Sequence, residues 1–277
     1  MVFPSFVGIG AEKCGSTWLH ELLKQHPKIY MPLRRKELNF FNLNYSRGLE
    51  WYESFFPNTQ DGTVYDAIGE ISPRYLNFPE CASRIATVKS IRKLIVILRN
   101  PVARAYSHYG HIVRLQGYSK SFEEFILERP KVIINGFYAK NLNYFLQYYS
   151  QDQIYCMIFE EAVNDIGCTK KKIARFLEVQ DNEFPEAAGL KKANETYIPK
   201  LKRLNQLSTQ MTGHLRNLNL DWTINVARAV GFKKVLRIGA KSLAPMPAEM
   251  RSRLQDIYAQ DIENLEKLLG INLDLWR

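Results

Sequence analysis

Two short stretches of the chain contain the residue types that hold a phosphate or sulfate group. The first is Gly10–Thr17, which reads GAEKCGST and follows the apolar run Phe6–Ile9. Apolar residues then recur at helical spacing until Pro27, so this region predicts a strand, a tight loop and a helix. Such a loop directs several backbone N–H groups and the positive end of a helix dipole at one point, where an anion can bind.

The side chains of this loop also suit an anion. Gly10 and Gly15 let the backbone curl around it, Lys13 adds a mobile positive charge, and Ser16 and Thr17 add hydroxyl donors. The glycine spacing is that of the Walker A loop, G-x-x-x-x-G-K-[ST], but a serine stands where that loop has its lysine. This departure counts against an ordinary ATP or GTP enzyme and fits a loop that grips one 5′-phosphate or phosphosulfate. A strand–helix turn with an incidental lysine is the alternative.

The second stretch, LRNPVARAYSHY, begins at Leu98. Arg99 stands at the end of a continuous aliphatic run, and Pro101 suits the first turn of the following helix. A guanidinium at a strand end can bind a phosphate through two parallel hydrogen bonds. Ser107 lies about two helical turns further on, on a face that could turn back towards Arg99. Two phosphate-binding sites on one sheet suggest a nucleotide phosphorylated at both ends. The alternative is that Arg99 forms a strand-end salt bridge and that Ser107 is an ordinary helix residue.

Strands and helices are expected to alternate along the chain. The expected strands are 6–9, 64–71, 93–98 and 154–159, and the expected helices are 18–26, 51–56, 79–90, 101–115, 121–128, 138–149, 169–178 and 246–269. This alternation predicts an α/β protein with a P-loop-like three-layer fold, in which helices flank a central parallel β-sheet. Ligands bind such sheets at the carboxyl ends of the strands, where both stretches lie.

The composition is that of a globular chain with excess positive charge. It has 277 residues, of which 46% are hydrophobic and 24% charged, and its net charge is +10. Such a chain can bury a substantial core, and its charge favours an anionic ligand, a polyanion or nucleic acid. We expect no signal peptide and no membrane span, since no apolar run approaches roughly 20 residues.

Cysteine usage bears on the compartment. The four cysteines have no spacing typical of a metal site; they are Cys14, Cys81, Cys156 and Cys168. We therefore expect reduced thiols and a cytoplasmic location, because a reducing compartment keeps thiols unpaired. A disulfide between Cys156 and Cys168 is the alternative.

Taken in order, the motifs resemble those of the sulfotransferases that use 3′-phosphoadenosine 5′-phosphosulfate (PAPS), most closely the bacterial and heparan-sulfate-type branch. GAEKCGST resembles the 5′-phosphosulfate loop, and LRNPVARAYSHY resembles the 3′-phosphate motif. KELNFF, from Lys36, is similar to the KEPHFF segment, and GEISPRYL, from Gly69, is similar to the GE-x-SP-x-Y element. The resemblance covers most of the chain and implies one domain over 1–277, with 200–245 as an acceptor-side helical lobe or lid.

The resemblance also implies residue roles. Lys13 would touch the sulfate-bridging oxygen and steady the leaving phosphate. The residues implied to bind the nucleotide are Lys13, Cys14, Gly15, Ser16, Thr17, Trp18, Arg99 and Ser107. Glu37 matches the glutamate that acts as general base in the glycan branch, although Leu38 and Asn39 replace that branch's proline and histidine.

The role of Glu37 has alternatives. Its cationic neighbours are Arg34, Arg35 and Lys36, so Glu37 would need partial burial to act as a strong base. It could instead pair with one of the arginines. A histidine could serve as the base, as in another branch of the family; the candidates are His20, His108 and His111.

The implied activity is in-line transfer of the sulfuryl group of PAPS to an acceptor hydroxyl or amine, without a metal. The acceptor would be a glycan or a small molecule, and nucleic acid would not be a partner. One alternative is a P-loop small-molecule kinase, for which Asp66 and Glu70 are only loose magnesium ligands. Another alternative is a basic nucleic-acid-binding module. The scattered positions of the lysines argue against it, because such modules gather their basic residues in one stripe.

Overall fold

The computed structural model describes residues 2–57, 64–190 and 241–277, together with isolated positions between 197 and 223. The chain forms two compact units. The first comprises Met1–Pro101, Phe137–Ala193 and Gln260–Arg277, and the second comprises Val102–Gly136 and Asn194–Ala259. The lobe expected over 200–245 falls almost wholly outside the described residues, so it stays a prediction, as does the single domain.

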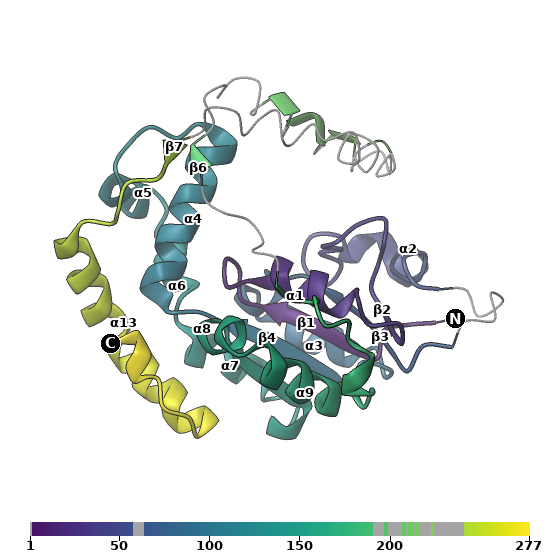
Figure 1. Cartoon of the computed structure of the whole chain (residues 1–277). Helices are drawn as coiled ribbons and strands as arrows, with labels where there is room; N and C mark the ends of the chain where they lie inside the picture. Colours follow the sequence, from purple (N-terminus) through teal and green to yellow (C-terminus); the bar gives the residue numbers. More distant parts are fainter. Residues whose placement is uncertain are drawn as a thin grey trace. The chain divides into compact units, whose positions relative to one another are not determined.

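The first unit is built on a parallel sheet of five strands in the order β2-β3-β1-β4-β5 (Figure 1). The strands are β1 (Phe6–Gly10), β2 (Ile29–Tyr30), β3 (Ala67–Ile71), β4 (Lys93–Leu98) and β5 (Ile154–Ile158). In the central strand, Val7 pairs with Glu70 on one side and with Leu94 on the other. Because β1 lies between β3 and β4, the chain changes direction across the sheet there, and this is where ligands of open α/β sheets bind.

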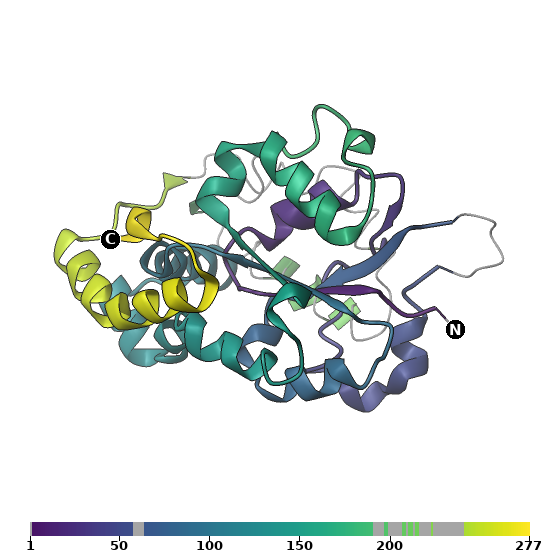
Figure 2. The ribbon, with the colours of Figure 1, turned by 90° about the horizontal axis from the view of Figure 1, so that it is seen from below.

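Helices cover both faces of this sheet. Figure 2 shows α1 (Ser16–Leu23) and α9 (Ile166–Leu177) on one face, and α3 (Glu80–Ala86) and α7 (Tyr138–Phe145) on the other. The unit also contains α2 (Gly48–Glu53) and α8 (Phe159–Asn164), and the short 3₁₀ turns Tyr45–Arg47, Tyr75–Asn77, Gln151–Gln153, Asp181–Glu183 and Asp274–Trp276. The aliphatic side chains of β1 and β4 are buried, as expected for strands covered on both faces.

The second unit is mainly helical. It contains α4 (Pro101–Gln116, from its second residue), α5 (Phe122–Glu128), α6 (Lys131–Ile134) and the part of α13 (Ala248–Leu269) that precedes Gln260. A two-residue strand pair, β6 (Tyr197–Ile198) with β7 (Lys241–Ser242), is antiparallel. Ser121 and Glu124 form a capping box that starts α5.

The expected fold class is confirmed: a central parallel sheet lies between helices. Several short elements were not expected, among them β2, α6, α8 and the strands β6 and β7. β2 has only two residues, too few to show a hydrophobic period, and it lies where no strand or helix was expected. α8 begins at Phe159, where the sequence predicted the last residue of a strand.

Two further expectations concern covalent links and membranes. All four cysteine thiols are free, so the alternative disulfide between Cys156 and Cys168 is absent. Among the helices in the described part of the chain, none combines the length and the apolar composition needed to cross a membrane.

Candidate functional site

The loop between β1 and α1 has the backbone of an anion site. Gly15 is the residue that caps the amino end of α1, with φ 102°, and it offers no side chain to the first-turn N–H groups. Lys13 also adopts a positive φ, 72°, within the tight turn. The first turn of α1 contains no acidic residue, so the positive end of the helix dipole is not neutralised by its own sequence.

Gly15 is required by close packing as well as by its backbone angle. A Cβ atom built on Gly15 would lie 2.4 Å from the Phe159 ring and 3.3 Å from Cδ1 of Ile97. Phe159 begins α8 directly after β5, and Ile97 lies in β4. The loop is therefore pressed against the carboxyl ends of the neighbouring strands.

Arg99 lies at the same end of the sheet and is connected to the loop through two aromatic residues. Its guanidinium carbon lies 5.4 Å from the centre of the Phe159 ring, the ring that packs on Gly15. The Tyr138 hydroxyl donates to the Arg99 carbonyl oxygen at 2.8 Å and lies 3.4 Å from Sγ of Cys14. The two predicted nucleotide-binding stretches, up to Arg99, are thus brought together around Phe159 and Tyr138.

The corner that follows Arg99 is fixed by the end of the chain. The Asn100 backbone N–H donates to Oε1 of Glu160 at 3.0 Å, and its side-chain amide donates to the Trp276 carbonyl oxygen at 2.9 Å. The indole N–H of Trp276 donates to the other oxygen of Glu160 at 3.3 Å. Because Trp276 is buried, this triangle holds the start of the Arg99 corner rigidly.

Glu37 is held at the amino end of α1 by the lysine that precedes it. The ammonium nitrogen of Lys36 lies 2.9 Å from Oε1 of Glu37, 3.0 Å from Oγ1 of Thr17 and 3.4 Å from Oγ of Ser16. The Glu37 side chain is 37% exposed, and among the described residues the ion pair seen for it is with Lys36, whereas the sequence had offered Arg34 or Arg35. Lys36 is a site residue that sequence reasoning treated only as a flanking charge.

A buried carboxyl group orients the segment that follows Glu37. Oε2 of Glu70 accepts from the Ser72 hydroxyl, and Oε1 accepts from the Tyr75 hydroxyl, both at 2.8 Å. The same two hydroxyl groups accept backbone hydrogen bonds, Ser72 from Asn39 at 2.9 Å and Tyr75 from Phe40 at 2.7 Å. The polar residues of the GE-x-SP-x-Y element are Glu70, Ser72 and Tyr75. Their contacts indicate that this element positions residues 39–41.

Burial raises the pKa of the Glu70 carboxyl from 4.5 to about 7, although the hydrogen bonds from Ser72 and Tyr75 oppose the shift. The folded protein therefore holds this proton more tightly than the unfolded chain does. The resulting stabilisation is complete below pH 4.5 and is lost as the pH rises through about 7.

We expect a corresponding pH dependence of stability. Relative to Glu70→Gln, which has no carboxyl group to titrate, the free energy of unfolding of the native chain should fall by about 3 kcal/mol between the unfolded and folded pKa values. Urea denaturation of both proteins at a series of pH values measures this difference. Parallel stability curves would contradict a buried carboxyl group of raised pKa.

His20, one of the alternative bases, is buried on α1. Burial, followed by the charges of Lys36 and Lys24, lowers the pKa of its imidazole to about 3. His20 is therefore neutral at neutral pH and a poor proton acceptor. Its Nδ1 atom has no hydrogen-bond partner among the described residues.

The remaining predicted residues divide between the two units. The indole N–H of Trp18 donates to the Gly189 carbonyl oxygen at 2.8 Å, so this side chain anchors a loop, while its backbone lies in the first turn of α1. Ser107 lies on α4 in the second unit, as do His108 and His111. Their relation to Arg99 and Glu37 stays a prediction.

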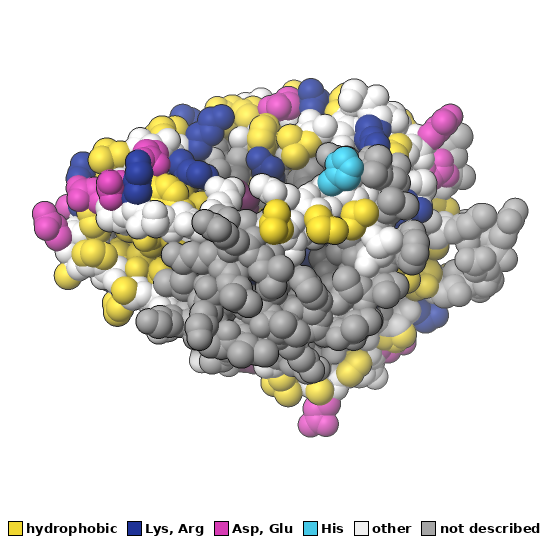
Figure 3. Space-filling view, turned by 90° about the horizontal axis from the view of Figure 1, so that it is seen from above, with side chains coloured by type: hydrophobic (Ala, Val, Ile, Leu, Met, Phe, Trp, Pro, Cys, Tyr) yellow, Lys and Arg dark blue, Asp and Glu magenta, His cyan; other side chains and the backbone are white. Residues whose placement is uncertain are grey.

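Two observations bear on the metal and nucleic-acid alternatives. Within 2–57, 64–190 and 241–277, no three histidine, cysteine or acidic side chains gather as metal ligands would. On the face in Figure 3, Lys and Arg side chains are interspersed with hydrophobic and acidic ones. Among the described residues visible there, they form no single basic stripe.

Comparison with known proteins decides the family. A model of the sulfotransferase domain matches residues 4–266. The chain belongs to the sulfotransferase domain family. The resemblance predicted from the motifs is thereby confirmed.

Two curated sulfotransferases illustrate the extent of the similarity. Membrane-associated sulfotransferase kil1 of Dictyostelium discoideum is 36% identical over 139 residues, which cover 48% of this chain and 29% of that protein. Heparan sulfate glucosamine 3-O-sulfotransferase 6 of Homo sapiens is 30% identical over 183 residues, which cover 63% of this chain and 52% of that protein. The chain therefore spans about half the length, or less, of these relatives.

The fold has a full-length counterpart among solved structures. A sulfotransferase from Alicyclobacillus acidocaldarius aligns over 100% of both chains, with a TM-score of 0.72 and 24% identity. At this identity the likeness concerns the fold alone.

Proposed function

We propose that this sulfotransferase moves the sulfuryl group of PAPS to an acceptor hydroxyl or amine. The observation that carries the proposal is the convergence of three groups at one end of the sheet. These groups are the amino end of α1 with Lys13, the Arg99 corner and the Glu37 carboxylate. The Phe159 ring contacts both the start of α1 and Arg99, and Lys36 connects Glu37 to Thr17 of α1. Anion binding, charge stabilisation and proton removal are the three tasks of sulfuryl transfer.

In the proposed reaction the acceptor oxygen attacks the sulfur atom in line with the bond to the 5′-phosphate. The new oxygen–sulfur bond forms as the bond between sulfur and the bridging phosphate oxygen breaks, and Glu37 accepts the acceptor proton. Lys13 stabilises the negative charge that develops on the bridging oxygen. The other product is adenosine 3′,5′-bisphosphate (PAP).

The donor would be held at both of its phosphate ends. Backbone N–H groups of Gly15, Ser16 and Thr17 would bind the 5′-phosphate, and Arg99 with Ser107 would bind the 3′-phosphate. All chemistry assigned here is carried by side chains and backbone dipoles, so we propose a metal-independent reaction.

The proposed acceptor is a carbohydrate, as the name of the heparan sulfate relative suggests by analogy. The test supplies PAPS with a desulfated heparan oligosaccharide, a neutral oligosaccharide or a simple phenol, and measures the PAP released. We expect acceptor-dependent PAP release with one of the saccharides. Release with the phenol alone would replace the carbohydrate by a small aromatic acceptor, and release with none would contradict all three acceptor classes.

We also propose a cytoplasmic location for this chain. The support is the set of four free thiols, which a reducing compartment would keep unpaired. Cell fractionation with an antibody against the chain tests this, and recovery with a secretory or membrane fraction would contradict it.

A further inference from the structure

The peptide group between Arg99 and Asn100 is held at both of its polar ends. Its carbonyl oxygen accepts from the Tyr138 hydroxyl at 2.8 Å, and its N–H donates to Oε1 of Glu160 at 3.0 Å. A buried peptide group bound in this way cannot rotate without losing a hydrogen bond. The direction in which the Arg99 side chain leaves the backbone is therefore fixed.

The Tyr138 oxygen also contacts the loop between β1 and α1. It lies 3.4 Å from Sγ of Cys14, so it can accept from the thiol while its own proton is donated to Arg99. The backbones of the loop and of β4 are joined as far as the hydrogen bond from the Ala11 N–H to the Ile97 carbonyl oxygen, at 2.7 Å. Tyr138 connects the two segments again beyond that point, where one leads into α1 and the other into the Arg99 corner.

Tyr138 is itself held in place by the elements around it. It is the first residue of α7, and the N–H groups of Ala139 and Lys140 donate to the two carboxylate oxygens of Asp261, at 3.1 and 3.3 Å. Asp261 belongs to α13 and is buried, as Tyr138 is. The Tyr138 ring lies 6.0 Å from the buried Trp276 ring. The packing of α7 therefore determines where the hydroxyl lies.

The contacts of Tyr138 bear on the distance between the two proposed phosphate sites. The loop would hold the 5′-phosphate and Arg99 the 3′-phosphate of one nucleotide, whose ribose restricts the distance between them. A ligand that engages two sites at once gains affinity only if the sites lie at the matching distance. A nucleotide with a single phosphate needs no such match.

We propose that Tyr138 is a positioning residue that holds the loop and Arg99 at the separation required by a nucleotide phosphorylated at its 5′ and 3′ positions. Its hydroxyl thereby makes the donor site selective for such a nucleotide over one that carries a 5′-phosphate alone. The inference rests on the proposed function, in which PAPS is the donor.

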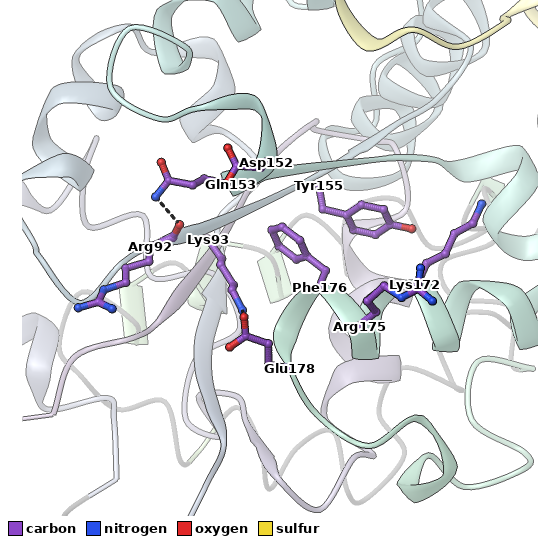
Figure 4. A pocket seen from close by; sticks show the side chains of 9 residues that line it. All are labelled: Arg92, Lys93, Asp152, Gln153, Tyr155, Lys172, Arg175, Phe176 and Glu178. Carbon is purple, nitrogen blue, oxygen red and sulfur yellow. Dashed lines mark hydrogen bonds and ion pairs between the residues drawn. The ribbon is translucent and has the colours of Figure 1, made fainter.

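The opposite end of β4 supplies a matched control. Tyr149, which is also buried, donates from its hydroxyl to the Ile91 carbonyl oxygen at 3.2 Å, just before β4 begins. At the next residue, the Arg92 carbonyl oxygen accepts from the Gln153 amide at 3.0 Å, at the edge of a pocket of about 570 Å³ (Figure 4). β4 is roughly 17 Å long, so this end lies away from the proposed donor site.

Isothermal titration with PAP and with adenosine 5′-monophosphate (AMP) tests the proposal through the ratio of the two affinities. Tyr138→Phe removes only the hydroxyl. We expect it to weaken PAP binding about fivefold and AMP binding less than about twofold, because the hydrogen bond that fixes the Arg99 corner is lost. Tyr149→Phe should change neither affinity. Urea denaturation should show a similar loss of stability in both variants, since each loses a buried hydroxyl-to-carbonyl hydrogen bond.

Asp261→Asn is a second variant, which weakens the support of α7 and leaves the Tyr138 hydroxyl in place. It should lower the preference for PAP over AMP by a smaller factor than Tyr138→Phe does. A preference for PAP that is unchanged in Tyr138→Phe, whether both ligands bind more weakly or neither does, would overturn the inference alone. A native chain that binds AMP as tightly as PAP would contradict the proposed donor, and the inference with it.

Discussion

Replacing Glu37 by glutamine is expected to lower kcat by about a thousandfold, with little change in the affinity for PAPS. Glutamine keeps the size of the side chain and can still accept a hydrogen bond from Lys36, but it cannot take the proton of the acceptor. Steady-state kinetics with PAPS and an established acceptor measure the effect. Glu21→Gln, which removes an exposed carboxylate from α1, is the matched control and should keep full activity.

Near-native turnover of Glu37→Gln would contradict its role as the base. His20 would be a weak replacement, because its imidazole is buried and its pKa is lowered to about 3. The search would then turn to His108 and His111 in the second unit.

Replacing Lys13 by alanine is expected to lower kcat by about a hundredfold and to change the KM for PAPS by less than about threefold. The backbone N–H groups and the dipole of α1 remain in this variant, so ground-state binding persists. The lost ammonium group acts mainly on charge that develops as the sulfur–oxygen bond breaks.

The matched control is Lys24→Ala, which removes an exposed cation just after α1. It should leave both constants unchanged. A large rise in KM with unchanged kcat in Lys13→Ala would show that Lys13 binds donor and transition state equally, and would contradict its proposed catalytic role.

Much of the fold could be predicted because its signals are local. The aliphatic run in β4 and the strand–loop–helix pattern from β1 to α1 each lie within one short window of sequence. β2 was not predicted, because it has only two residues and their extended conformation depends on pairing with β3. Their own hydrophobic pattern carries no strand signal. The start of α8 at Phe159 likewise depends on where β5 ends against β4.

The members of the candidate site could be proposed from the sequence, but the contacts that connect them could not. Lys13, Glu37 and Arg99 could be singled out from residue type and motif. That Lys36 joins Glu37 to Thr17, and that Phe159 lies against both Gly15 and Arg99, depends on distances across the folded chain. Glu70 illustrates the same limit, since the motif singles it out but only the fold shows its burial and its hydrogen bonds from Ser72 and Tyr75.

The central claim is that this chain binds a nucleotide phosphorylated at both ends, without a metal. The most direct test is calorimetric titration with PAP, in parallel with ADP and with ATP plus Mg²⁺. We predict metal-free PAP binding that Arg99→Ala weakens by about tenfold or more, because a charge-assisted bidentate contact is lost. Arg251→Ala, which removes an exposed arginine from α13, should bind PAP normally. Magnesium-dependent binding of ATP, with no binding of PAP, would contradict the account and identify a kinase-like site instead.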